Sequence, residues 1–175
     1  MVNKGMEKDK PKTKVVRWMK EILTFTLIVT VLSLAIDAWR SREMPSTNMP
    51  SLSMSTLEGD WVDIKKMSQD KPILLYFWAT WCSVCNFVSP SVNWLSESHQ
   101  VISVALSSGD DRRLGQFMAY KEYDFPVIND PKGNIGQTWN ITVIPSIFIV
   151  KNGEISSITT GFTTPMGMWL RLYFS

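Results

Sequence analysis

Two cysteines stand three residues apart in the segment 81–85, which reads WCSVC, and they are the only cysteines among 175 residues. An apolar run at 73–78 comes shortly before them, so the pair falls where a buried strand is predicted to turn into a helix. There the positive end of the helix dipole stabilises a thiolate at the first cysteine. The spacing therefore indicates a site that exchanges disulfides and not one that only stores a bridge.

The size and charge of the chain limit the classes of protein to consider. A length of 175 residues allows one ordinary domain and an appendage. The formal net charge of +2 is too small to indicate a nucleic-acid-binding protein. Seven Lys and Arg residues lie within 1–21 against three acidic residues, so this segment is predicted to be a polar, basic tail.

The segment after this tail has the length and apolarity of a membrane anchor. Residues 22–36 carry no charge, and the stretch 18–39 would span about 33 Å as a helix, against a hydrocarbon layer of about 30 Å. Trp18 and Trp39 would lie at the two interfaces. We therefore predict a transmembrane anchor at 22–39. Its basic side would face the cytoplasm, which places the rest of the chain beyond the membrane.

Two other interpretations of this segment compete with an anchor. A buried core helix is disfavoured because the segment has no polar face. A cleaved signal peptide stays open, since Ile36-Asp37-Ala38 is a weak small-residue cleavage site.

Beyond the anchor, residues 40–50 predict an irregular linker and residues 51–175 a single α/β domain. Strand-like and helix-like patterns alternate along this domain. The expected elements are a hairpin at 51–56 and 61–64, strands at 73–78, 101–106 and 126–128, helices at 83–97, 112–123 and 134–139, a hairpin at 146–150 and 155–160, and a helix at 165–173. This order indicates a sandwich with a central mixed sheet flanked by helices.

The cysteine motif and two prolines resemble a known family. Thioredoxin-fold oxidoreductases have a similar active-site segment, helix proline, cis-proline loop and last hairpin, matched here by 78–85 (WATWCSVC), Pro90, Ile144-Pro145 and 151–154 (KNGE). The early hairpin and the added stretch 107–139 are similar to the membrane-anchored TlpA/ResA/DsbE-like branch. With its basic tail and anchor, the whole chain is most similar to the suppressor-of-copper-sensitivity protein D group.

This resemblance implies a thioredoxin-like domain preceded by a single transmembrane helix. It implies a single-pass protein of the bacterial inner membrane, with a cytoplasmic N-terminus and a periplasmic domain. Its partners would be client proteins with disulfides and, as electron donor, a transmembrane thiol reductase of the DsbD kind. The chemistry would need no cofactor and no metal.

The chain departs from the family pattern at two acidic positions. Thioredoxin has a buried aspartate six residues before the first cysteine, where this chain has Tyr76. ResA-like proteins have a glutamate three residues after the second cysteine, where this chain has Val88. The group that accepts the proton of Cys85 therefore stays open. The redox potential also stays open, because the dipeptide Ser83-Val84 between the cysteines helps to set it.

The two cysteines receive different roles from their positions on the predicted helix. Cys82 is nearest the helix start and is expected to be the nucleophile, and Cys85, one turn inward, is expected to resolve the mixed disulfide. From the resemblance, Pro145 is expected to be cis, and Ile144 to offer backbone groups to a substrate peptide; an ordinary turn proline is the alternative. Trp81 is expected on the apolar rim where a partner docks, with plain core packing as its alternative.

Other uses of the cysteine pair compete with exchange chemistry. An inert bridge would restrain the unfolded chain little, because its loop is so short. Zinc would need two more ligands, and the chain offers no further cysteine and one histidine, His99, which is expected to be a surface residue. Binding of Cu(I) by the pair stays open.

Two further groups of side chains carry weaker signals. Methionines can bind Cu(I), but those near the linker are better explained as scattered linker residues: Met44, Met49 and Met54. Asp110 and Asp111 are expected to cap a helix.

These observations predict a membrane-tethered, extracytoplasmic thiol–disulfide oxidoreductase that reduces client disulfides through Cys82 and Cys85, and the resemblance implies a link to copper tolerance. One alternative is a reductant of apocytochrome c thiols in cytochrome c maturation. Another is an oxidant, and a third is a Cu(I)-binding or redox-sensing module without turnover.

Overall fold

The structure is a computed structural model that describes residues 18–25, 27–28, 31–32 and 49–175. The chain divides into two compact units, Met1–Trp39 and Arg40–Ser175, and each is described by itself.

In the first unit the described residues are helical, and their side chains are exposed. Within the residues that the structure describes, we find no helix with the length and apolar character needed to cross a bilayer. Much of the predicted anchor at 22–39 lies outside the described residues, as do most of the basic tail and most of the linker at 40–50. The anchor, the tail and the linker therefore stay predictions.

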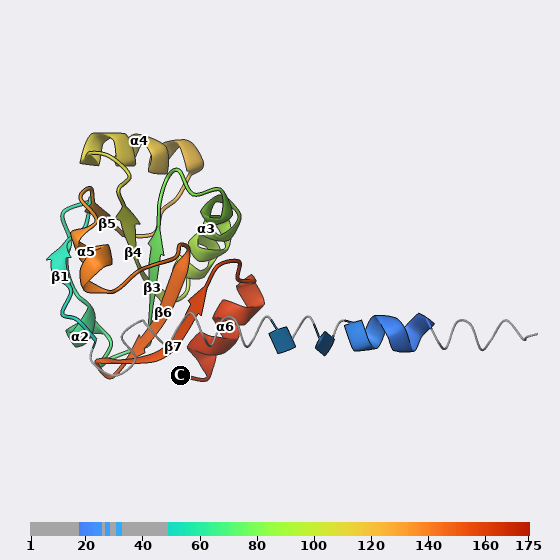
Figure 1. Cartoon of the computed structure of the whole chain (residues 1–175). Coiled ribbons are helices and arrows are strands. Elements are labelled where there is room, and N and C mark those ends of the chain that lie inside the picture. The colour runs from blue at the N-terminus through green and yellow to red at the C-terminus, as the bar shows by residue number, and fades with distance from the viewer. Residues whose placement is uncertain (1–17, 26, 29–30, 33–48) are drawn as a thin grey trace, which may run out of the picture. The chain divides into compact units, whose positions relative to one another are not determined.

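The second unit contains the elements that the sequence predicts, in the same order (Figure 1). They are β1 (Ser53–Ser55), β2 (Trp61–Asp63), α2 (Ile64–Met67), β3 (Ile73–Trp78), α3 (Ser83–Ser96), β4 (Gln100–Leu106), α4 (Asp111–Lys121), β5 (Val127–Asp130), α5 (Asn134–Thr138), β6 (Ser146–Lys151), β7 (Glu154–Thr160) and α6 (Pro165–Tyr173). The single-turn helix α2 is the one element that the sequence analysis does not include.

The five-stranded sheet is mixed, as predicted, and has the order β5-β4-β3-β6-β7. β3 pairs in parallel with β4, and β4 pairs in parallel with β5. β6 runs antiparallel to both β3 and β7. The strands β1 and β2 form a separate antiparallel hairpin, which confirms the predicted early hairpin.

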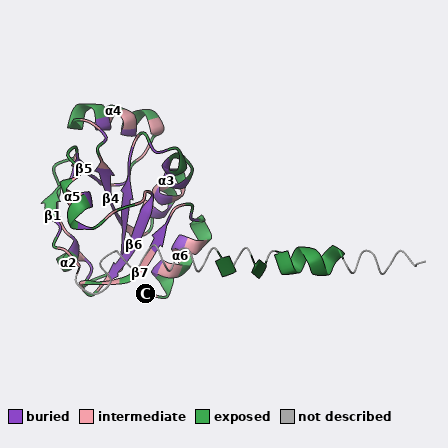
Figure 2. Ribbon diagram, viewed as in Figure 1, coloured by how far each residue is buried: buried purple, intermediate pink, exposed green. Residues whose placement is uncertain are grey.

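The central strand β3 is buried on both faces, as its uninterrupted apolar sequence predicts (Figure 2). Its side chains alternate between two cores because successive residues of a strand point to opposite faces. One core, which includes residues of α3, α4 and α6, takes Leu74, Tyr76 and Trp78. The other, which includes residues of β2 and the segment around α5, takes Ile73, Leu75 and Phe77. In Figure 1, α3 and α6 accordingly lie on one side of the sheet, and α5 with the hairpin lies on the other.

The strand directions bring four chain segments to one edge of the sheet. The parallel strands β3, β4 and β5 all end there, and β6 begins there because it runs antiparallel to β3. The residues that follow β3 include both cysteines, and the residues that precede β6 include Pro145. In α/β sheets this edge is where ligands bind.

Capping residues explain where the longer helices begin. Asp110 accepts a hydrogen bond from the Arg113 amide at the start of α4, and Thr164 accepts one from the Gly167 amide at the start of α6. α4 ends at Lys121, two residues before the predicted end, because Glu122 adopts a left-handed conformation with φ of 56°. No glycine marks this position, so the sequence gives no signal for the stop.

The second core depends strongly on Trp139, which is fully buried and has ring centroids 5.4 Å from Phe77 and 5.5 Å from Phe148. We expect Trp139→Ala to lower the free energy of unfolding by roughly 3–5 kcal/mol, since it removes a large buried aromatic side chain. Urea denaturation followed by circular dichroism measures this loss. Trp94→Ala is the matched control, because Trp94 is 56% exposed and its removal should change stability by only about 0.5 kcal/mol. Equal losses from the two variants would contradict this account of the core.

Candidate active site

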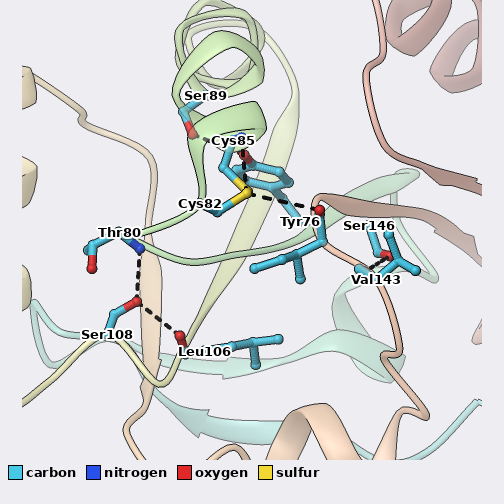
Figure 3. The surroundings of a disulfide bond; sticks show 10 residues. Tyr76, Thr80, Cys82, Cys85, Ser89, Leu106, Ser108, Val143 and Ser146 are labelled. Carbon is cyan, nitrogen blue, oxygen red and sulfur yellow. Dashed lines mark hydrogen bonds between the residues drawn. A yellow bond between two sulfur atoms is a disulfide. The ribbon is translucent and has the colours of Figure 1, made fainter.

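Cys82 and Cys85 form a disulfide at the N-terminus of α3 (Figure 3). Cys82 occupies the position just before the helix, and its Sγ accepts a hydrogen bond of 3.1 Å from the Cys85 amide. Cys82 is 7% exposed and Cys85 1%, so Cys82 is the more accessible of the two sulfurs. The backbone donor and the helix N-terminus would both stabilise a thiolate at Cys82 after reduction.

The loop before β6 lies against the disulfide. The Ile144–Pro145 peptide bond is cis, as expected. The carbonyl oxygen of Ile144 lies 4.0 Å from Cys82 Sγ. A hydrogen bond of 2.8 Å from the Gly161 amide to the Pro145 carbonyl ties this loop to the end of β7. The structure therefore brings together the cysteines and the Ile144-Pro145 pair, which are more than fifty residues apart in the sequence.

Trp81 lies on the surface beside Cys82. It is 64% exposed, so the alternative of plain core packing is wrong. Its indole Nε1 donates a hydrogen bond of 3.1 Å to the Ser107 carbonyl, which fixes the ring against the segment that follows β4. Val84 and Phe87 are also exposed near the start of α3, so the surface around the cysteines carries several apolar side chains. Its use in docking a partner stays a prediction.

The segment after β4 is joined to the active-site segment by a second hydrogen bond. The Thr80 amide donates to Ser108 Oγ over 3.0 Å, and Ser108 Oγ in turn donates to the Leu106 carbonyl over 3.0 Å (Figure 3). Ser108 is buried, and its hydroxyl group is fixed by these two hydrogen bonds. A cavity of about 510 Å³ lies at this junction, and its lining includes Trp81 and Arg113.

Beneath α3, two hydroxyl groups occupy the region where the family pattern has an acid. Tyr76 Oη and Ser89 Oγ are 3.0 Å apart, and both residues are buried (Figure 3). Burial raises the pKa of Tyr76, and its hydrogen bond with Ser89 works in the opposite direction. The phenol therefore stays neutral at physiological pH. Val88, at the other acidic position of the family pattern, is packed in the same core as Cys85.

The remaining candidate residues from the sequence lie away from the cysteines or have structural roles. His99 precedes β4, at the opposite end of this strand from the active site, and pairs with the neighbouring Ser98. Met49 packs against the second core and Met54 is exposed, while Met44 lies outside the described residues. Asp110 caps α4 as predicted.

The prediction for Asp111 is wrong in its detail. This residue is the first of α4, and its carboxylate accepts a hydrogen bond of 2.8 Å from the Asn129 side chain instead of capping the helix. For metal binding, we find within the described ranges no three His, Cys, Asp or Glu side chains placed to hold an ion.

Sequence reasoning misses two features of the site. It does not single out Ser89, although this residue lies one helical turn after Cys85 and so faces the same core. It assigns Arg113 only to a helix, although that helix follows the end of β4, where ligand-binding loops gather. Both signals depend on knowing which elements are neighbours.

Comparison with known proteins agrees with this geometry. Residues 45–158 match the model of the AhpC/TSA family. A thioredoxin-like protein of Haemophilus influenzae is 34% identical over 163 residues, which cover 93% of this chain and 97% of the relative. The ResA thiol–disulfide oxidoreductase of Oceanobacillus iheyensis is 30% identical over 102 residues, which cover 55% of this chain and 53% of the relative.

A solved structure has the same fold. It is that of a secreted Mycobacterium tuberculosis disulfide oxidoreductase homologous to Escherichia coli DsbE, with a TM-score of 0.60 and 22% identity. The match covers 71% of this chain and 96% of the solved chain. At this identity the likeness shows the fold alone.

The buried phenol of Tyr76 predicts how stability changes in alkaline solution. In the unfolded chain this group loses its proton near pH 10, whereas the folded protein keeps the proton bound to higher pH. Stability should therefore fall as pH rises above about 10, by up to about 1.4 kcal/mol per pH unit for this group. Tyr76→Phe should make the fall less steep, while lowering stability at pH 7 by about 1 kcal/mol because the hydrogen bond between Tyr76 and Ser89 is lost.

Urea denaturation between pH 7 and pH 11 measures both effects. Tyr120→Phe, at an exposed position of α4, is the matched control. It should lose as much stability at high pH as the unaltered protein does. Part of the fall should remain in Tyr76→Phe, because burial also raises the pKa of Tyr123. If the unaltered protein and Tyr76→Phe lost the same stability between pH 7 and pH 11, the folded protein would not hold the Tyr76 phenol neutral as described.

Proposed function

Since the chain belongs to the AhpC/TSA family and is a thiol–disulfide oxidoreductase, we propose that it is of the ResA/DsbE type and acts as a membrane-tethered reductant of client disulfides on the extracytoplasmic side of the membrane. The chemistry would be carried out by Cys82 and Cys85. The electrons would come from a transmembrane thiol reductase of the DsbD kind.

One observation carries the assignment of roles to the two cysteines. Cys82 Sγ caps α3 and accepts the Cys85 amide hydrogen bond, and it is the less buried of the two sulfurs. An N-terminal helix position favours the thiolate, which is the attacking form. Cys85 lies one turn farther into the helix, within reach of Cys82 but shielded from a client.

The reaction would proceed in two exchanges. The Cys82 thiolate attacks one sulfur of the client disulfide, so that a Cys82–client disulfide forms and the second client sulfur leaves as a thiolate. Cys85 then loses its proton and attacks Cys82 Sγ, which forms the Cys82–Cys85 disulfide and releases the first client sulfur. Two electrons pass from the cysteine pair to the client, and the bridged state is the product seen in the structure.

The loop at Ile144-Pro145 is proposed to hold the client during attack. The Ile144 carbonyl lies 4.0 Å from Cys82 Sγ and so lies beside the attacking sulfur. A client segment in extended conformation could pair with this backbone, which gives affinity without requiring a particular client sequence. Trp81 would support the client on the other side of Cys82 with its exposed indole.

The tether is supported by the sequence of the first forty residues. An uncharged segment with basic residues before it is typical of an anchor whose N-terminus stays in the cytoplasm. Attachment to the membrane would raise the effective concentration of the oxidoreductase near a membrane-embedded donor. A link to copper tolerance rests on the resemblance alone, and growth of a deletion strain on copper tests it.

Replacement of one cysteine at a time should separate the two roles. We expect Cys85→Ser to accumulate mixed disulfides with clients, because Cys82 can still attack but nothing then displaces the client. Cys82→Ser should trap few or none. Non-reducing electrophoresis of cells treated with a thiol-blocking reagent measures the trapped species. Equal trapping by both variants, or by neither, would contradict the assignment of nucleophile to Cys82 and resolving thiol to Cys85.

The same variant tests the topology, because Cys85→Ser leaves Cys82 as the only thiol in the chain. Because Cys82 of this variant is expected to be held partly in mixed disulfides, the spheroplasts are first treated with a reductant, which is then removed. We expect a membrane-impermeant maleimide then to label Cys82 without lysis, and the protein to remain with the membrane fraction after a high-pH wash. The reason is that the domain at 51–175 would lie beyond the bilayer and the anchor would be retained. Gel mobility of the labelled protein against the full-length chain measures retention.

A matched control for labelling is a chain without its native cysteines that carries Asn3→Cys. This thiol should react only after lysis, since the tail at 1–21 would be cytoplasmic. Labelling of Cys82 only after lysis would overturn the topology. A product shortened by about forty residues would overturn the retained anchor in favour of a signal peptide.

A further inference from the structure

The cavity beside Cys82 lies at the carboxyl ends of three parallel strands. Its lining includes Trp81 from the segment after β3, Ser107 and Ser108 after β4, and Pro131 after β5. Crevices at this edge of an α/β sheet are the usual place for ligands. At about 510 Å³, the cavity is large enough to receive a side chain of a bound partner.

The walls of this cavity are fixed by hydrogen bonds that also hold the active-site segment. Trp81 Nε1 donates to the Ser107 carbonyl, and the Thr80 amide donates to Ser108 Oγ. These two hydrogen bonds therefore fix the position of the cavity relative to the segment that carries Cys82. Trp81 and Phe117 give the cavity aromatic walls.

Arg113 supplies the charge of the cavity. It lies in the first turn of α4. Its Cδ lies only 2.8 Å from the position that a Cβ on Gly109 would occupy, so the arginine side chain packs directly against the backbone of this glycine. Among the residues that line the cavity in the described part of the chain, Arg113 is the one that carries a charge.

The acidic groups near Arg113 are occupied elsewhere. The Asp110 carboxylate accepts the Arg113 backbone amide, and the Asp111 carboxylate accepts the Asn129 side chain. The buried Asp130 carboxylate accepts the amides of Asn134 and Gly136. Within residues 49–175, no carboxylate pairs with the guanidinium of Arg113. The guanidinium of Arg113, in the cavity that Trp81 also lines, therefore has its planar set of donors available for a carboxylate of a partner.

We infer that this cavity binds an acidic side chain of the client, a few residues from the cysteine under attack, and that Arg113 sets a preference for such clients. The inference rests on the proposed function and adds a substrate class to it. In the strand order, β6 lies on one side of β3 and β4 on the other. The Ile144-Pro145 loop before β6 and the cavity at the end of β4 therefore lie on different sides of the segment that carries Cys82. A client that crosses Cys82 would meet backbone groups on one side and the Arg113 cavity on the other.

Model peptides with one disulfide test this preference. In matched peptides, Glu, Gln or Lys replaces a single residue at each position from three before to three after one cysteine. The rate at which the reduced full-length protein reduces each peptide is measured by alkylation of its thiols. At one position or two adjacent positions, we expect the Glu peptide to react roughly tenfold faster than the Gln peptide, as a charge-assisted contact at a partly open site would give. The Lys peptide should be slower than both.

Two variants locate the effect on the arginine. Arg113→Gln should react equally with Glu and Gln peptides, and a circular dichroism spectrum and unfolding transition like those of the unaltered protein would show that the variant is folded. Arg113→Lys should keep part of the preference, since it retains the charge but not the planar fork. Arg112→Gln is the matched control, because Arg112 is the adjacent exposed arginine but does not line the cavity, and it should keep the full preference.

The outcomes distinguish this inference from the function on which it rests. Equal rates for Glu and Gln peptides at every position would overturn the inference, and so would a preference that survives in Arg113→Gln. An equal loss in Arg112→Gln and Arg113→Gln would also overturn it, because the effect would then come from net charge and not from the cavity. A protein that reduces none of the peptides would overturn the proposed function itself.

Discussion

The hydrogen bond from the Cys85 amide to Cys82 Sγ places a sulfur where a helix-capping oxygen usually stands. That contact requires α3 to begin at Ser83, directly after the cysteine, and it requires the segment from β3 to arrive at a fixed position. β3 can provide this position because all six of its residues are buried between two cores. The reactivity of the site therefore depends on the burial of a strand that takes no part in the chemistry.

The order of the strands then determines what surrounds the sulfur. β6 is antiparallel to β3, so its first residues, and the cis peptide bond before them, meet Cys82 from one side. β4 and β5 are parallel to β3, so the segments that follow them meet it from the other side. The two sides differ in chemistry: one offers a backbone carbonyl, and the other offers a polar cavity with an arginine. If clients bind as proposed, an oxidoreductase built in this way would accept many clients through the backbone and would discriminate among them by charge.

The sequence was sufficient for the parts of this structure that depend on local pattern. The uninterrupted apolar run at 73–78 predicted β3 with its bounds, and the apolar spacing after Ser83 predicted α3, because each element buries one continuous surface. The cysteine pair and the Ile144-Pro145 pair could be connected only through a resemblance. Contacts between distant elements had no local signal: the pairing of Tyr76 with Ser89 and the presence of Arg113 and Trp81 in the lining of one cavity both follow from how helices pack on the sheet.

The pair Tyr76 and Ser89 also bears on the lack of an acid at the two positions where the family pattern has one, Tyr76 and Val88. A carboxylate beneath α3 would sit among apolar side chains, where an isolated charge is strongly destabilising and would shift toward its neutral form. Two neutral hydroxyls that hydrogen-bond each other avoid this penalty and keep the core closed. Neither changes its charge within the physiological range of pH. The protonation of the cysteines themselves, and not that of a neighbouring group, would then set how the exchange rate depends on pH.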